Sequence, residues 1–307
     1  MKVFVCVSLT DAQRARLEGA LAKDAIHYHP DAEVAPKVFA ECEVAFGNPP
    51  AAWLPANASL RWIQLESVGF GEYGELDWER LGDRLKISNL AGFFAEPVAE
   101  SILAGVLSHY RGVGALALLQ QRHEWVGESL RPSLRVLKNA NVVLFGSGAI
   151  NTRVGELLEP FGCKITRFGR GFEHKALEAA LREADIIICT VPHTPQTKGL
   201  FDRRQLGPLK RGSLFVNFGR GSLIAEAALA DALDSGALGG AIIDVTQDEP
   251  LPPDHRFWTC RNMLLTQHTG GGTGDEVDRK IDLFIANLER YRRGERPQSL
   301  VDFKRGY

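Results

Sequence analysis

Continuous apolar runs, rather than alternating ones, mark most of the predicted strands in this chain. In the second part of the sequence they occupy Val142–Phe145, Asp185–Thr190, Ser213–Phe218, Ala241–Val245 and Met263–Thr266. Such runs are typical of strands that are covered on both faces. Helical patterns at Phe172–Arg182 and Glu226–Leu233 lie between them. The pattern predicts a parallel, doubly wound α/β sheet.

A smaller α/β unit is predicted over roughly the first 90 residues, because short apolar runs alternate there with helical patterns. Its expected strands are Val3–Val7, Val44–Phe46, Trp62–Leu65 and Leu85–Ile87. Asp11–Leu21 is predicted to be a helix capped by Thr10 or Asp11. The change of composition at Ala95 marks the boundary with the larger unit.

One long helix is predicted from Ala95 to about Gln121, with Pro97 in its first turn. A helix of this length either crosses between domains or packs against a partner. The polar stretch from His123 to Lys138 then forms an arm that leads into the large sheet. Near the end of the chain, residues 275–291 show the pattern of an amphipathic helix.

Composition excludes several classes of protein. The 307 residues are 45% hydrophobic and carry a net charge of -2. The basic residues are scattered and form no cluster that would indicate a nucleic-acid-binding surface. The five cysteines lack the spacing of a metal site, so reduced core residues are expected. His27 and His29 suit a surface strand better than a metal site, and no metal is expected. The short apolar run at the N-terminus favours a soluble, cytoplasmic protein over a secreted or membrane-spanning one.

A glycine turn follows the strand Val142–Phe145 and opens a helix. Gly146 permits a tight turn, and Gly148 lets the backbone approach a pyrophosphate at the helix N-terminus. Asn151 occupies the third position of this motif, where glycine is usual. Glycine motifs alone are weak signals. Because strands flank this one, we predict a dinucleotide-binding site.

Three polar residues follow predicted strands of the large sheet: Arg220, Glu249 and His268. The carboxyl ends of parallel strands share one edge, so these side chains are expected to converge beside the dinucleotide. An arginine fork suits a carboxylate and its neighbouring carbonyl, and a histidine can supply the proton as an alkoxide forms. Glu249 would favour the protonated imidazole. The set suits hydride transfer to the carbonyl of a 2-oxo acid, with Asp244 facing the nicotinamide.

Several separated motifs resemble the D-isomer-specific 2-hydroxyacid dehydrogenases, and together they cover nearly the whole chain to Leu300–Tyr307. They are Val191–Leu200, the arginine motif Val216–Gly221 with Gly219 where alanine is usual, the glutamate motif Asp244–Pro252, and the histidine motif Thr266–His268 with Gln267 where proline is common. The position of the glycine turn, well inside the chain, argues against the L-lactate dehydrogenase type.

The resemblance implies a Rossmann-type nucleotide domain, residues 93–274, inserted into a flavodoxin-like substrate domain, residues 1–92 completed by 275–307. It implies catalytic roles for Arg220, Glu249 and His268. It places Val68 and Gly69 where relatives grip the substrate carboxylate through backbone N–H groups, together with Arg220 and His268. It also implies a homodimer, with the helix from Ala95 and the arm near Trp125 as interface candidates.

The cofactor preference is expected to depend on the end of the second strand of the large sheet. Gly169 stands where NAD-preferring relatives carry an acidic residue that takes the ribose 2′-OH, and Arg170 follows, with Arg167 nearby. A glycine–arginine pair leaves room for a 2′-phosphate and adds a positive partner, so NADPH is preferred and NAD is the alternative. The predicted cofactor contacts are Gly146, Gly148, Ala149, Ile150, Gly169, Arg170, Thr190, Val191, Pro192, Thr197, Phe218, Gly219, Arg220, Asp244, His268 and Gly270.

These features predict NADPH-dependent reduction of a small 2-oxo acid, such as glyoxylate or hydroxypyruvate, to the D-2-hydroxy acid. Phosphite oxidation is an alternative, because relatives share the catalytic set. Formate oxidation is disfavoured, since Glu249 stands where those relatives carry glutamine. A dinucleotide-sensing corepressor is the alternative from outside the enzymes. It is disfavoured because no long disordered tail is present and the dinucleotide site favours NADP.

Overall fold

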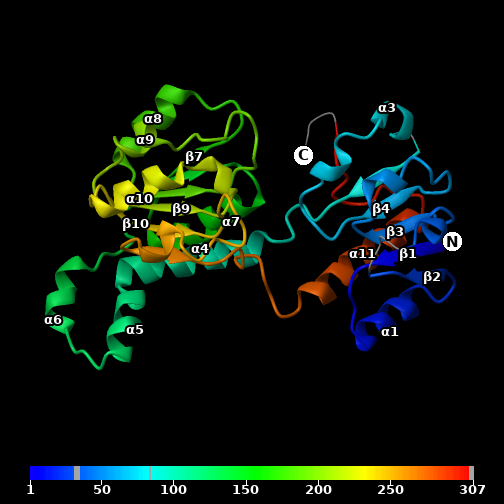
Figure 1. Cartoon of the computed structure of the whole chain (residues 1–307), viewed down its shortest axis with the longest axis horizontal. Helices are drawn as coiled ribbons and strands as arrows, with labels where there is room; N and C mark the ends of the chain where they lie inside the picture. Colours follow the sequence, from blue (N-terminus) through cyan, green and yellow to red (C-terminus); the bar gives the residue numbers. More distant parts are fainter. Residues whose placement is uncertain (31–34, 83, 304–307) are drawn as a thin grey trace. The chain divides into compact units, whose positions relative to one another are not determined.

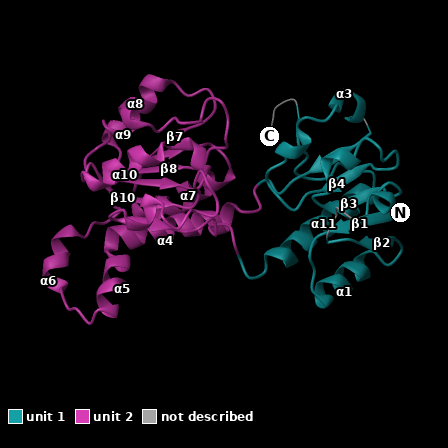
Figure 2. Cartoon of the chain, viewed as in Figure 1, with its two compact units in different colours: residues 1–91, 273–307 teal, residues 92–272 magenta. Residues whose placement is uncertain are grey.

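The computed structural model describes residues 1–30, 35–82 and 84–303, so the end of the closing segment, 304–307, lies outside the described residues. The chain divides into two compact units (Figure 2). Unit 1 contains Met1–Ala91 and Thr273–Tyr307, and unit 2 contains Gly92–Gly272. The polypeptide therefore leaves unit 1, builds unit 2 and returns.

Unit 1 is built on a parallel five-stranded sheet of order β2-β1-β3-β4-β5. Its strands are β1 (Lys2–Cys6), β2 (Ala25–Tyr28), β3 (Val44–Gly47), β4 (Trp62–Gln64) and β5 (Lys86–Ser88). This order is the flavodoxin-like one. His27 lies on the edge strand β2, as predicted, whereas His29 follows the strand and its ring stacks on that of Phe4, with centroids 5.5 Å apart.

Helices cover the sheet of unit 1. They are α1 (Asp11–Ala20), α2 (Pro36–Phe39), α3 (Trp78–Leu81) and α11 (Glu276–Arg292), with α11 in red beside the N-terminal strands in Figure 1. Thr10 caps α1 and forms a capping box with Gln13, which decides between the two predicted caps. The ring of Phe284 on α11 stacks on Phe46 and Trp62, with centroids 4.5 and 5.6 Å away. The C-terminal helix thus completes the core of unit 1.

Unit 2 holds a parallel six-stranded sheet of order β11-β10-β9-β8-β6-β7. Its strands are β6 (Asn141–Phe145), β7 (Lys164–Phe168), β8 (Ile186–Cys189), β9 (Ser213–Asn217), β10 (Leu238–Ile243) and β11 (Met263–Leu265). One core joins the sheet to α8 (His174–Glu183), α9 (Arg203–Leu206) and α10 (Glu226–Asp234), and a second core joins it to α4 (Ala95–Arg111) and α7 (Ala149–Leu158). Helices on both faces confirm the doubly wound fold.

The single long helix predicted from Ala95 is wrong. Gly112 adopts a left-handed φ of 65° and separates α4 from α5 (Val113–Gln121), which are bent by 69°. While α4 packs in the core, α5 and α6 (Gly127–Leu130) project from the body of unit 2 (Figure 1). In the described part of the chain, no single helix is long and apolar enough to span a membrane, although α4 and α5 taken together pass by length and composition.

Replacing Phe284 by alanine tests the part that α11 plays in unit 1. The ring is fully buried, so its loss should lower the free energy of unfolding of this unit by about 3–5 kcal/mol. The matched control is Glu289→Ala on the exposed face of the same helix, expected to change stability by about 0.5 kcal/mol or less. Denaturant unfolding measures both, and equal effects would contradict the packing role.

Candidate active site

Three neighbouring strands of unit 2 end at one edge of the sheet. Asn217, the last residue of β9, pairs with Ile243 on β10, and Ile243 pairs with Leu265 on β11. Because these strands are parallel and in register, the loops that follow them leave the sheet together. Those loops carry Arg220, Glu249 and His268.

His268 and Glu249 form a direct contact. The His268 Nδ1 and Glu249 Oε2 atoms are 2.7 Å apart, and the other carboxylate oxygen accepts a hydrogen bond from the backbone N–H of Thr246 at 3.0 Å. His268 is 57% exposed and Glu249 37% exposed. With both carboxylate oxygens and the Nδ1 atom engaged, Nε2 is the ring nitrogen left to meet a substrate.

The pKa of Glu249 is lowered from its ordinary value. Partial burial acts to raise it, but the hydrogen bonds from His268 and Thr246 and the charges of His268 and Arg220 outweigh burial. Glu249 is therefore a carboxylate at neutral pH. The contact with the carboxylate at Nδ1 holds the ring so that Nε2 is left for proton transfer.

Asp244 holds the histidine loop against β10. Its Oδ1 accepts hydrogen bonds from the Thr266 hydroxyl at 2.6 Å and from the Gly270 N–H at 3.1 Å. Its backbone carbonyl accepts the N–H of His268 at 2.7 Å. Asp244 is buried, so these bonds are shielded from water and fix the loop on both sides of His268.

The backbone at the histidine is left-handed. Gln267 has φ 52° and His268 has φ 56°, a region that non-glycine residues seldom occupy. Proline, common in the family at the position of Gln267, is restricted to φ near about −65° and cannot take this conformation. The departure noted in the sequence thus fits the local backbone of this chain.

Close backbone contacts position the arginine loop. The Asn217 side chain accepts from the N–H of Gly219 and donates to the carbonyl of Arg220, both at 3.0 Å. A Cβ at Gly221 would lie 2.0 Å from the carbonyl carbon of Thr246, so only glycine fits. The arginine loop is packed directly on the segment that begins the glutamate motif.

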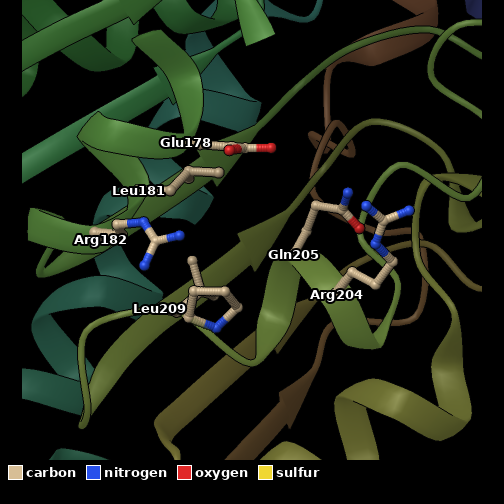
Figure 3. Close-up of a pocket in the computed structure, with 7 residues that line it drawn as sticks. Glu178, Leu181, Arg182, Arg204, Gln205 and Leu209 are labelled. Carbon is tan, nitrogen blue, oxygen red and sulfur yellow. The ribbon is translucent and has the colours of Figure 1, made fainter. Parts of the chain in front are cut away.

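A cavity of about 430 Å³ adjoins the histidine–glutamate pair. Its lining is Ile243, Asp244, Thr246, Glu249, Pro250, Leu251, Trp258, Leu265, Gln267 and His268. Apolar side chains thus lie next to three titratable groups, Asp244, Glu249 and His268, as in small-molecule sites. A second cavity, of about 200 Å³, lies between α8 and α9 and is lined by Glu178, Arg182 and Arg204 among others (Figure 3). It contains none of the three residues of the candidate site.

The glycine turn fits the pyrophosphate of a dinucleotide. Gly146 has φ 120°, and a Cβ there would lie 2.9 Å from the Thr190 hydroxyl, which closes this position to other residues. A Cβ at Gly148 would meet open space. Within the described residues, no side chain caps α7, so backbone N–H groups at its N-terminus are available to an anion.

Other predicted cofactor residues surround the turn or lie in the loop after β8. Gly169, at the end of β7, packs on Ser147, whose Cβ would be 2.8 Å from a Cβ at 169. Thr197 is buried, and its hydroxyl donates to the carbonyl of Pro192 at 2.7 Å, so it shapes the loop. Gly270 packs against the Phe218 ring.

In unit 1, two side-chain hydrogen bonds fix the backbone carbonyls of Val68 and Gly69. The Asn89 side chain donates to the carbonyl of Val68 at 2.9 Å, and the Ser67 hydroxyl donates to the carbonyl of Gly69 at 2.7 Å. In a trans peptide the N–H points opposite to the carbonyl. The N–H of Gly69 therefore points away from Asn89.

Two residues of the site were not singled out from the sequence. Asn217 orders the arginine loop, and Thr246 anchors Glu249. A buried polar residue at the end of the apolar run Ser213–Phe218 was the available signal for Asn217. Thr246 binds Glu249 through its backbone N–H, which the sequence cannot reveal, and its hydroxyl donates to the carbonyl of Asp248 at 2.8 Å. Within the described residues, no group of three or more His, Cys, Asp or Glu side chains could hold a metal ion.

The doubly wound fold and the glycine turn define an α/β protein of the dinucleotide-binding type. The family description that matches residues 103–270 is "D-isomer specific 2-hydroxyacid dehydrogenase, NAD binding domain". The chain belongs to the D-isomer-specific 2-hydroxyacid dehydrogenase family, which confirms the resemblance found in the sequence.

Relatives and solved structures agree with that membership. A glyoxylate reductase from Aeropyrum pernix is 29% identical over 258 residues, covering 79% of this chain and 76% of the relative. The TT0316 protein from Thermus thermophilus is 27% identical with a TM-score of 0.79, covering 98% and 100% of the two chains. A probable 2-hydroxyacid dehydrogenase from Rhizobium etli, solved with NADP, has the same fold, with a TM-score of 0.81, 23% identity, and coverage of 100% and 99%.

The titration of Glu249 tests the contact with His268. In the wild-type protein, carboxyl NMR shifts should give a midpoint below the ordinary glutamate value of about 4.3, so the contact survives until the pH falls through that lower midpoint. In His268→Ala, the hydrogen bond and the charge are lost while burial remains, so the midpoint should rise. An unchanged midpoint in the variant would show that His268 does not set this pKa.

Proposed function

We propose that this chain is an NADPH-dependent reductase that converts a small 2-oxo acid, such as glyoxylate or hydroxypyruvate, to the D-2-hydroxy acid. The observation that carries the proposal is the 2.7 Å contact between His268 and Glu249, beside the charge of Arg220. A cationic fork, a proton donor and its carboxylate partner are the groups that reduction of a carbonyl beside a carboxylate requires. The glyoxylate reductases among the relatives support this substrate class.

Substrate binding is assigned to Arg220 and to the backbone of the Val68–Gly69 loop. The guanidinium group would hold the carboxylate and the carbonyl oxygen of the 2-oxo acid in one plane. The backbone N–H groups at Val68 and Gly69 are proposed as further donors to a substrate carboxylate. The carbonyl carbon is made more electrophilic because a positive charge lies at the oxygen where negative charge develops.

His268 is assigned as the proton donor. Its Nδ1 is held by Glu249, so its Nε2 would give a proton to the carbonyl oxygen as the alkoxide forms. The left-handed loop bonded to Asp244 keeps the ring in place. In the oxidation direction, the neutral ring would take the proton from the hydroxyl group.

A nicotinamide dinucleotide would be held by the Gly146–Gly148 turn, by Thr190 and the loop that follows, and by the edge near Asp244 and Gly270. When bound, the reduced nicotinamide supplies the hydride. Phe218 packs on Gly270, and Gly219 packs on the Val191 peptide. These two residues would contact the nicotinamide ring. Family membership itself establishes a domain that binds a nicotinamide dinucleotide.

The preference for NADPH rests on the end of β7. Gly169 lies so close to Ser147 that a side chain at 169 would require Ser147 to move, which disfavours an acidic residue there. Arg170 follows at once. The guanidinium group of Arg167 packs against Gly155 on α7, so closely that a Cβ at position 155 would overlap with it. Arg167 and Arg170 place two cations near this strand end, and Gly169 carries no carboxylate of its own, which together favour a 2′-phosphate.

Alanine substitution of the two arginines tests this preference. Arg170→Ala should lower the ratio of kcat/KM with NADPH to that with NADH by about tenfold, the value of one charge-assisted contact, and Arg167→Ala/Arg170→Ala by more. Arg182→Ala, on α8 in the same unit, is the control and should leave the ratio unchanged. If the double variant keeps the wild-type ratio, the assignment of these arginines fails.

Initial rates over a panel of 2-oxo acids test the reaction and the role of His268. The wild-type protein should oxidise NADPH with glyoxylate or hydroxypyruvate, and His268→Ala should lower kcat about 10²- to 10⁴-fold. Glu249→Gln should retain more activity, because the amide still contacts the ring. Near-normal turnover of His268→Ala at neutral pH would refute the proton-donor role.

The same panel separates the alternatives. Turnover with phosphite and no 2-oxo acid would favour phosphite oxidation. Dinucleotide binding without turnover of any substrate would favour a corepressor-like sensor.

We also propose a homodimer formed through α4, α5 and the arm. The arm exposes apolar side chains, with Trp125 98% exposed, and α5 exposes Val113 and Leu118. Apolar surface that a single copy leaves in water is typical of an interface.

A further inference from the structure

Asn151, at the third position of the glycine motif, is hydrogen-bonded to the turn. Asn151 lies in the first turn of α7 and is only 1% exposed. Its Nδ2 atom donates a hydrogen bond to the carbonyl oxygen of Gly146 at 2.9 Å. The side chain therefore links the helix to the first glycine, and a glycine at 151 could not make this link.

Gly146 is held from three sides. Its N–H donates to the carbonyl of Phe168 at 2.8 Å, its carbonyl accepts from Asn151, and its Cα faces the Thr190 hydroxyl. The carbonyl of Gly146 and the N–H of Ser147 belong to one peptide plane and point in opposite directions. By holding that carbonyl, Asn151 fixes the direction of the Ser147 N–H within the glycine turn.

The orientation of the Asn151 amide is also fixed. Its Oδ1 atom is buried and accepts no hydrogen bond from the described residues. Turning the amide over would place Oδ1 against the carbonyl of Gly146, so two acceptors would face each other. The donor therefore stays on Gly146. Aspartate at this position would offer no donor when ionised and would add a negative charge.

We propose that Asn151 is a positioning residue for the dinucleotide. Its hydrogen bond holds the Gly146–Ser147 peptide in the conformation in which the Ser147 N–H meets the pyrophosphate, before the ligand binds. Preorganisation of this kind raises affinity by removing the cost of ordering the turn. The inference rests on the proposed function in taking a nicotinamide dinucleotide as the ligand, but it does not depend on the 2-oxo acid.

Fluorescence titration of the purified full-length protein, without any 2-oxo acid, tests the inference. Asn151→Ala and Asn151→Gly remove the donor and should raise the Kd for NADPH, NADH and ADP-ribose by a similar factor, about fivefold to tenfold for one hydrogen bond. Asn151→Asp should raise it further. ADP-ribose is included because it carries the pyrophosphate and lacks the nicotinamide. At saturating dinucleotide, kcat should stay within about twofold of wild type, since the reacting groups are untouched.

Asn141→Ala is the matched control. Asn141 begins β6, at the opposite end of the strand from the turn, and its side chain also donates to a backbone carbonyl, that of Glu183 at 3.1 Å. This variant should keep the wild-type Kd. Melting temperatures of all variants separate folding from binding.

Two results would overturn the inference. If Asn151→Gly, which introduces the residue usual in this motif, bound all three ligands as tightly as wild type, the hydrogen bond would not position the turn. If Asn151→Ala melted at a lower temperature but kept the wild-type Kd, the role would be structural. A wild-type protein that binds dinucleotide but reduces no 2-oxo acid would contradict only the proposed function, whereas one that binds no dinucleotide would overturn both.

Discussion

The candidate site depends on the parallel register of β9, β10 and β11. Their carboxyl ends lie side by side, so residues far apart in the chain leave the sheet at one edge. Asp244 at the end of β10 converts this proximity into a fixed geometry, because one buried side chain bonds both Thr266 and Gly270. Without these bonds, the left-handed backbone at His268 would have little to hold it.

Backbone packing contributes as much as side-chain bonding. Gly219 approaches the Val191 peptide, and Gly221 approaches Thr246 so closely that a methyl group would overlap with it. The loops after β8, β9 and β10 therefore pack on one another directly. A small movement of one loop would displace its neighbours. The loop after β8 is thereby linked, through the arginine loop, to the loop that carries Glu249.

Much of the fold could be read from the sequence, because each buried parallel strand leaves a continuous apolar run. The doubly wound sheet and the family were predicted correctly, and the structure selects Thr10 from the two predicted caps, Thr10 and Asp11. The break at Gly112 was missed, since the apolar pattern of a helix continues on both sides of that glycine and only its left-handed φ separates α4 from α5.

The residue types of the candidate site and the partnership of Glu249 with His268 were predictable, but the hydrogen bonds that hold their loops were not. The motifs pointed to Arg220, Glu249 and His268, whereas the hydrogen bonds from Asn217 and the Thr246 backbone depend on loop conformation. Asn151 illustrates the same limit. From the sequence it was a missing glycine, and in the structure it is a hydrogen-bond donor to the turn.

The proposed reaction transfers a hydride at this edge to a 2-oxo acid and forms the D-product. Reduction of hydroxypyruvate with NADPH deuterated at C4 on the transferring face, followed by chiral analysis and mass spectrometry of the product, follows that hydride to its destination. We expect D-glycerate carrying deuterium at C2. L-glycerate, or D-glycerate without deuterium at C2, would show that the edge does not perform this reaction.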